Sequence, residues 1–112
     1  HMKKYLAVFV APIEAYDKMK AANATKSSEE KKAEMDKWMA WMAAHKADFA
    51  DVGGGVGAAK RVTKEGITDT RNEIGGYMIV QAESLDAAAK IFVDSPEDME
   101  GARVEVMEIM QM

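Results

Sequence analysis

The chain has no cysteine, only two prolines and no long apolar run. Without cysteine there is no disulfide framework, no thiolate nucleophile and no zinc site with cysteine ligands. No run approaches the 18 or so apolar residues of a membrane span, and the apolar start resembles a strand more than a signal peptide. These absences favour a cytoplasmic protein.

Basic residues are also fewer than acidic ones. The sequence has 15 Lys and Arg residues and 19 Asp and Glu residues, for a net charge of -4. The basic residues are scattered, so the sequence predicts no surface for nucleic acid. We interpret His1 and Met2 as cloning residues, which leaves His45 as the single imidazole. The predicted domain therefore covers residues 3–112, which is enough chain for one compact core.

Two predicted strands, Tyr5–Val10 and Tyr77–Ala82, are apolar on both of their faces. A strand with one face in water should alternate apolar and polar residues, because its side chains point to the two faces in turn. Pro12 ends the first strand, and Gly75 and Gly76 precede the second. Both strands are therefore expected to be covered on both faces.

A long helix is predicted from Ser27 and Ser28, which acidic residues follow, to about Phe49. Its apolar stripe has the helical period and consists of Met35, Trp38, Met39, Met42 and Phe49. Trp41 and His45 lie on the flank of this stripe. A short helical segment is predicted over 14–22, and the ten methionines are interpreted as core filler.

The glycine-rich stretch 52–59 predicts a bulged strand over 55–62. A turn at 63–66 and a returning segment at 67–68 make this a hairpin. Residues 69–73 are expected to form a polar loop.

The last elements are a helix over 85–93, with Ser84 as its N-cap, and a strand over 103–110. The alternation of this strand slips at Val106 and Met107, which predicts a bulge or burial on both faces.

The predicted order of strands and helices is βαββαβ, the ferredoxin-like α+β arrangement of one antiparallel sheet with both helices on one face. Apolar side chains left wet on the other face would forfeit about 1.5–3 kcal/mol each. A second copy packed sheet to sheet would cover them, and twofold dimers are the commonest oligomers. The sequence therefore predicts a homodimer.

Several short motifs also occur in a fixed order. They are Gly75-Gly76-Tyr77, Glu83-Ser84-Leu85-Asp86-Ala87-Ala88, a loop proline at Pro96, Gly101 and Val104-Glu105-Val106-Met107-Glu108-Ile109, after a start at Lys3 to Phe9. In this order and spacing the chain resembles the YCII-related family. The resemblance implies a dimeric α+β barrel of ferredoxin-like protomers, with relatives that include enzymes acting on aromatic or chlorinated ring compounds.

The resemblance also implies a catalytic pair that this chain departs from. The family's proposed chemistry uses a histidine near the start of the first helix and an aspartate immediately before the loop proline. Here the long helix opens with Ser27-Ser28-Glu29-Glu30, and Ser95 precedes Pro96, with Asp94 one position further back. The His–Asp chemistry therefore does not transfer from the resemblance.

The candidate catalytic residues are His45, Asp94 and Tyr77. An imidazole titrates near neutrality, but as a general base it needs a partner and a pocket. The plainer interpretation of His45 is a half-exposed helix histidine. The acidic residues of 94–100 are interpreted as a solvated loop, and the glycines of 53–57 as turn backbone, so no metal or cofactor is predicted.

The candidate ligand-binding residues are Trp38, Trp41, Met42, Arg71 and Ser95. They would line an apolar pocket with a few polar groups, between the long helix and the sheet. The alternative is that they belong to the core and the dimer interface.

Three functions stay open. The first is a homodimer that holds a small, partly aromatic molecule between the long helix and the sheet, with no assigned catalysis. The second is a cofactor-free lyase, isomerase or dehydrochlorinase-like enzyme on a small ring compound, which needs a titratable side chain in a cavity. The third is a non-catalytic accessory protein, which should expose an apolar patch beyond the dimer face.

Overall fold

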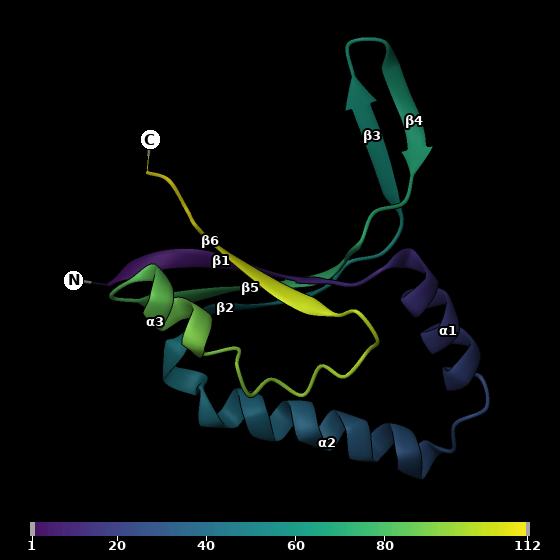
Figure 1. Ribbon diagram of the computed structural model, residues 1–112, viewed down its shortest axis with the longest axis horizontal. Coiled ribbons are helices and arrows are strands. Elements are labelled where there is room, and N and C mark those ends of the chain that lie inside the picture. The colour runs from purple at the N-terminus through teal and green to yellow at the C-terminus, as the bar shows by residue number, and fades with distance from the viewer. Residues whose placement is uncertain (1, 112) are drawn as a thin grey trace.

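The computed structural model describes residues 2–111, and it has the predicted ferredoxin-like α+β fold (Figure 1). The four-stranded antiparallel sheet has the order β2-β5-β1-β6, and β3 and β4 form a separate hairpin. The elements are β1 (Lys3–Val10), α1 (Ile13–Asn23), α2 (Ser28–Ala44), the short 3-10 helix η1 (Lys46–Asp48), β2 (Phe49–Gly55), β3 (Ala59–Thr63), β4 (Gly66–Thr70), β5 (Ile74–Ala82), α3 (Leu85–Lys90) and β6 (Arg103–Glu108).

The core lies between one face of the sheet and helices α2 and α3. Side chains at alternate positions of the two central strands reach it, because a strand points every second residue to the same face. The buried residues of this cluster are Tyr5, Ala7, Phe9, Trp41, Met78, Val80, Ala82, Ala88, Ile91 and Phe92. Trp38, Phe49, Val104 and Val106 pack against its edge. The sheet and the two helices thus form the two layers expected of this fold.

The other face of the sheet has no helix over it (Figure 1). Leu6 pairs with Ile79 on β5 and with Met107 on β6, and Val8 pairs with Tyr77. These five residues, which we call the open face, are apolar or aromatic. The β3–β4 hairpin projects from the sheet on the side away from α2 (Figure 1). The open face is therefore the surface that the sequence predicts to be covered by a second copy.

Two glycines are required by close backbone packing. Gly53 has φ +62°, and a Cβ there would lie 1.9 Å from the carbonyl oxygen of Tyr77. At Gly75 a Cβ would lie 2.6 Å from the hydroxyl of Tyr16, which donates a hydrogen bond to the carbonyl oxygen of Glu73 at 2.8 Å. Gly53 thus permits the bulged pairing of β2 with β5, and Gly75 lets α1 pack on β5.

The end of the long helix was predicted wrongly. Helix α2 ends at Ala44 and not at Phe49, because His45 leaves the helical conformation at φ -109° and ψ 16°. Phe49 begins β2, so the predicted strand over 55–62 is also wrong: β2 ends at Gly55 and β3 begins at Ala59. The true start of β2 was missed because its sequence, Phe49 to Gly55, has no regular apolar alternation and ends in three glycines.

The predicted phase of the apolar stripe was also wrong. Met35 is 66% exposed and Met39 is 60% exposed, whereas Trp41 is only 6% exposed. The buried side of α2 is therefore set by Trp38 and Trp41. Among residues 2–111, six of the nine methionines are at least 40% exposed, so the interpretation of methionine as core filler does not hold for them.

The remaining elements are close to their predictions. Helix α1 and the hairpin are confirmed and are longer than predicted, with β4 continuing to Thr70, while α3 already ends at Lys90. Strand β6 ends at Glu108 and pairs with β1 in a continuous register, so there is no bulge at Val106 and Met107. These two side chains point to opposite faces, which explains the slip in alternation. Within residues 2–111 no helix is long and apolar enough to cross a membrane.

Candidate functional site

His45, at the C-terminal end of α2, lies between two carboxylates. Its Nε2 is 3.2 Å from Oδ1 of Asp94, in the segment after α3, and its Nδ1 is 3.3 Å from Oδ2 of Asp48 in η1. The same Oδ1 of Asp94 accepts a hydrogen bond from the indole N–H of Trp41 at 3.1 Å. The structure therefore brings together three of the residues singled out from the sequence, and adds Asp48.

Asp94 is the acceptor that Trp41 and His45 share in this cluster. The hydrogen bond from Trp41 holds the pKa of the Asp94 carboxyl below its ordinary value; loss of solvent opposes the shift, and the hydrogen bond from His45 adds to it. The cluster ties the end of α2 to the segment after α3.

The cluster is not a cavity. The His45 side chain is 20% exposed, whereas that of Asp94 is 69% exposed at the surface. The indole of Trp41 packs against the rings of Trp38, His45, Phe49 and Phe92, with centroids 5.2–5.9 Å away. Neither His45 nor Asp94 lines any of the cavities described below, and Trp41 is part of the core.

The other candidate residues are spread over the molecule. Tyr77 lies on the open face, with the sheet between it and His45. Arg71 pairs with Asp17 of α1 at 2.9 Å beside the base of the hairpin. Ser95 lines a depression between α3 and β6, and Met42 lines a shallow groove near the start of β2. The structure does not bring these four residues into one site.

A cavity with an aromatic side chain in its wall lies between α1, α2 and the segment that joins α3 to β6, and we call it the α1–α2 cavity. Its volume is about 410 Å³, within the range of about 300–1,000 Å³ that is usual for ligand sites. Of the candidate residues, Trp38 lines it. The others that line it are Ala15, Lys18, Met19, Ala22, Asn23, Lys26, Glu34, Lys37, Pro96, Glu97, Asp98, Met99 and Glu100.

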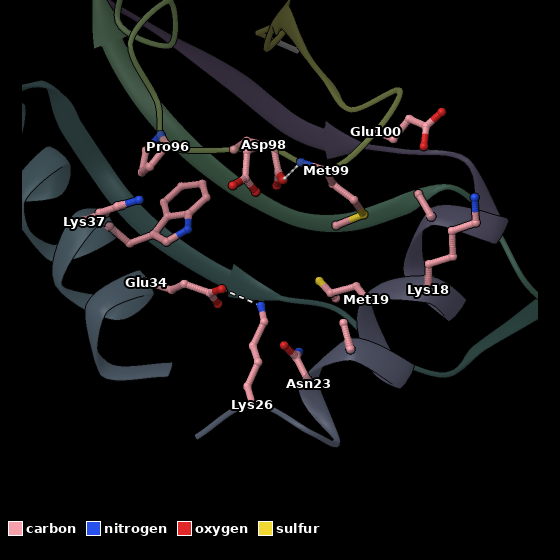
Figure 2. A pocket seen from close by; sticks show the side chains of 14 residues that line it. Lys18, Met19, Asn23, Lys26, Glu34, Lys37, Pro96, Asp98, Met99 and Glu100 are labelled. Atoms are coloured by element: carbon pink, nitrogen blue, oxygen red, sulfur yellow. Dashed lines mark hydrogen bonds and ion pairs between the residues drawn. The ribbon is translucent and has the colours of Figure 1, made fainter. Parts of the chain in front are cut away.

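The polar groups of this cavity stand on its rim. Figure 2 shows Lys26 and Glu34 joined on one side of the opening, and Asp98 on the opposite side. Met19 and Met99 lie between these two sides (Figure 2). The arrangement combines apolar groups with a rim that is richer in charge than the usual binding pocket, since half of the lining residues are charged.

The sequence alone did not single out most of these cavity residues. Asn23 is the last residue of α1, a helix that was only weakly indicated, and Lys26 lies in the connection from α1 to α2. Asp98 was assigned to a solvated acidic loop, and the structure indeed leaves it exposed, but at the rim of a cavity. The feature of the sequence that could have indicated this cavity is Lys26, the lysine immediately before the helix cap at Ser27. Within residues 2–111 no three His, Asp or Glu side chains lie close enough together to hold a metal ion.

Comparison with protein-family models gives one match, to the YCII-related domain, over residues 12–112. The chain belongs to the YCII-related family. A comparison with curated proteins gives no match.

This YCII-related chain carries a histidine–aspartate pair, His45 and Asp94. The family pattern described above puts the histidine near the start of the first helix, whereas His45 comes from the far end of α2. Its partner Asp94 stands two residues before Pro96 and not next to it. The pair therefore occupies neither of the positions that the resemblance implied.

Proposed function

We propose that this YCII-related protein is a homodimer that binds a small, partly aromatic molecule in the α1–α2 cavity. The observation that carries the proposal is the cavity of about 410 Å³ with Trp38 in its wall. The Trp38 ring is held in place by edge-on contacts with Phe9 and Trp41, at centroid distances of 5.6 and 5.9 Å. A fixed indole offers a flat apolar surface to a ring without losing side-chain freedom on binding.

The size of the exposed surface supports the dimer. The chain exposes 8260 Å², whereas a compact monomer of 12.3 kDa is expected to expose about 6,100 Å². The difference is of the order that a protein–protein interface removes, about 800 Å² or more from each partner. The open face is the surface where this burial is favourable, because Leu6, Ile79 and Met107 are apolar.

The enzyme alternative has one favourable observation, the cluster of His45 with Asp48 and Asp94. Acid–base catalysis needs the imidazole within reach of a bound substrate, and this imidazole is occupied by two carboxylates outside the cavity. Binding without assigned catalysis is therefore the function that the geometry supports better. A cytoplasmic location stays a prediction from composition.

The binding proposal is tested by filling the cavity. Ala22 lines it, whereas its neighbour Ala21 does not, although both are exposed residues of α1. We expect Ala22→Phe to abolish binding of a neutral aromatic probe, para-methylbenzyl alcohol, followed by tryptophan fluorescence and by NMR of the methionine methyl groups. Ala21→Phe is the matched control and should bind like the unmodified protein.

The contrary result is equally clear. Equal binding by the two variants would place the aromatic site elsewhere, and no binding by the unmodified protein would remove the proposal. Native mass spectrometry of protein purified gently from its own host is an independent test, because it measures the mass of any ligand that the protein retains.

A further inference from the structure

We infer that the α1–α2 cavity takes a small zwitterion, whose ammonium and carboxylate groups stand at opposite ends of an apolar body. The inference rests on the proposed function, because it names the class of molecule for the same cavity. It is carried by the way in which charge is divided around the rim.

The two sides of the rim carry opposite charge. The side formed by α1, α2 and their connection has three lysines and one glutamate, and the side formed by the segment before β6 has only carboxylates. The lysines are Lys18, Lys26 and Lys37, and the carboxylates facing them belong to Glu97, Asp98 and Glu100. A ligand with a single charge would be attracted by one side and repelled by the other, whereas a zwitterion aligned across the cavity is attracted by both.

The basic side offers donors for a carboxylate. The side chain of Lys26 is only 24% exposed, and its ammonium group is held by Glu34. An ammonium has three donors, so Lys26 keeps two for a ligand. The half-buried amide of Asn23 stands beside it (Figure 2). A carboxylate here would form a charge-assisted hydrogen bond, which is stronger than a bond between neutral groups.

The acidic side offers acceptors for an ammonium group. Glu97 accepts a hydrogen bond from the backbone N–H of Met99 at 3.0 Å, which fixes its direction. Asp98 takes part in none of the ion pairs found among residues 2–111. Its carboxylate and the ammonium of Lys26 thus face each other across the opening without meeting (Figure 2).

The apolar body of the ligand would lie between these charges. Trp38, Met19 and Met99 line this part of the cavity. Methionine adapts its shape to a bound group and makes favourable contacts with aromatic rings. A ring with one charged substituent at each end therefore matches the order of groups from one side of the cavity to the other.

The test compares four probes of nearly equal shape by calorimetry. They are para-aminomethylbenzoate, para-methylbenzylamine, para-methylbenzoate and the neutral para-methylbenzyl alcohol. We expect the zwitterion to bind more tightly than any of the other three, by up to about fivefold for each ion pair that it adds, since an ion pair near a surface gives a modest gain.

Two variants assign the charges. Lys26→Gln should weaken binding of the zwitterion and of para-methylbenzoate and should not weaken binding of para-methylbenzylamine, because it leaves the Glu34 carboxylate without its partner. Asp98→Asn should weaken the zwitterion and para-methylbenzylamine and leave para-methylbenzoate unchanged. Lys32→Gln is the matched control, because Lys32 is on α2 but pairs with Asp36 away from the cavity. Thermal unfolding of each variant confirms that it is folded.

The outcomes separate the two proposals. If the alcohol binds as tightly as the zwitterion and depends on the cavity, the proposed function stands and the zwitterion is overturned. If a singly charged probe binds most tightly, the division of charge is not what selects the ligand, and the inference is again overturned. If none of the four binds, both proposals fail.

Discussion

At the level of single residues, the most informative side chain is Trp41. Its place in the sequence, four residues before His45, correctly indicated that the indole and the imidazole are neighbours. Its burial was not predictable, because the methionines at 35 and 39 shift the apparent apolar stripe toward the solvent side. What decides the orientation is Asp94, 53 residues later, which accepts the indole N–H. A contact between such distant residues leaves no periodic signal in the sequence.

The same hydrogen bond makes stability depend on pH. The pKa of Asp94 is lowered in the folded state, chiefly by Trp41, so its contribution is present above the unfolded-state pKa of about 3.9 and is lost as pH falls through the folded value. Below about pH 4 the unmodified protein should therefore lose more stability than Asp94→Asn, which cannot titrate. Urea unfolding at a series of pH values checks this. If the free energy of unfolding depends on pH in the same way in both proteins, Asp94 does not contribute to the pH dependence of stability.

At the level of elements, the beginnings of helices were easier to predict than their ends. Ser27 accepts a hydrogen bond from the backbone N–H of Glu30 at 3.1 Å, and the Glu30 carboxylate accepts one from the backbone N–H of Ser27 at 3.4 Å. This capping box is local and visible in the sequence. The end of α2 is decided instead by His45, whose ring is held by residues outside the helix.

The capping box gives a prediction for α2. Ser27→Ala removes the acceptor for the N–H of Glu30, and we expect it to lower the free energy of unfolding by about 1 kcal/mol. Ser28→Ala is the control, because Ser28 is the first residue of the helix itself and its change leaves the cap intact. Guanidinium unfolding of both variants measures the difference. Equal decreases in the free energy of unfolding for the two variants would mean that the Ser27 cap does not stabilise the start of α2.

At the level of the whole molecule, the fold class was predictable and the shape was not. Two strands that are apolar on both faces predicted a sheet with one face left open, and Leu6, Ile79 and Met107 lie on that face. The hairpin itself was predicted, but its projection from the sheet was not. It contributes to a radius of gyration of 15.9 Å, whereas a compact chain of this length is expected to have about 13 Å. The position of the α1–α2 cavity also depends on how three distant segments pack.

The open face leads to a test of assembly. We expect the protein at micromolar concentration to sediment as a dimer, and Ile79→Lys to sediment as a monomer, because a buried lysine at the interface would lose its hydration. Val93→Lys is the control, since Val93 is 83% exposed beyond the end of α3 and away from the open face. A monomeric unmodified protein would contradict the homodimer.

The hairpin also divides the chain into two interleaved halves. Its exposed Lys60, Arg61 and Lys64 are natural points of attack for trypsin. The piece before such a cut holds β1 and β2, and the piece after it holds β5 and β6. Because β5 lies between β2 and β1, and β6 pairs with the other edge of β1, neither half can form the sheet alone. A nicked molecule is thus held together by its own strand order, and the hairpin is the natural place to split the protein into fragments that reassemble.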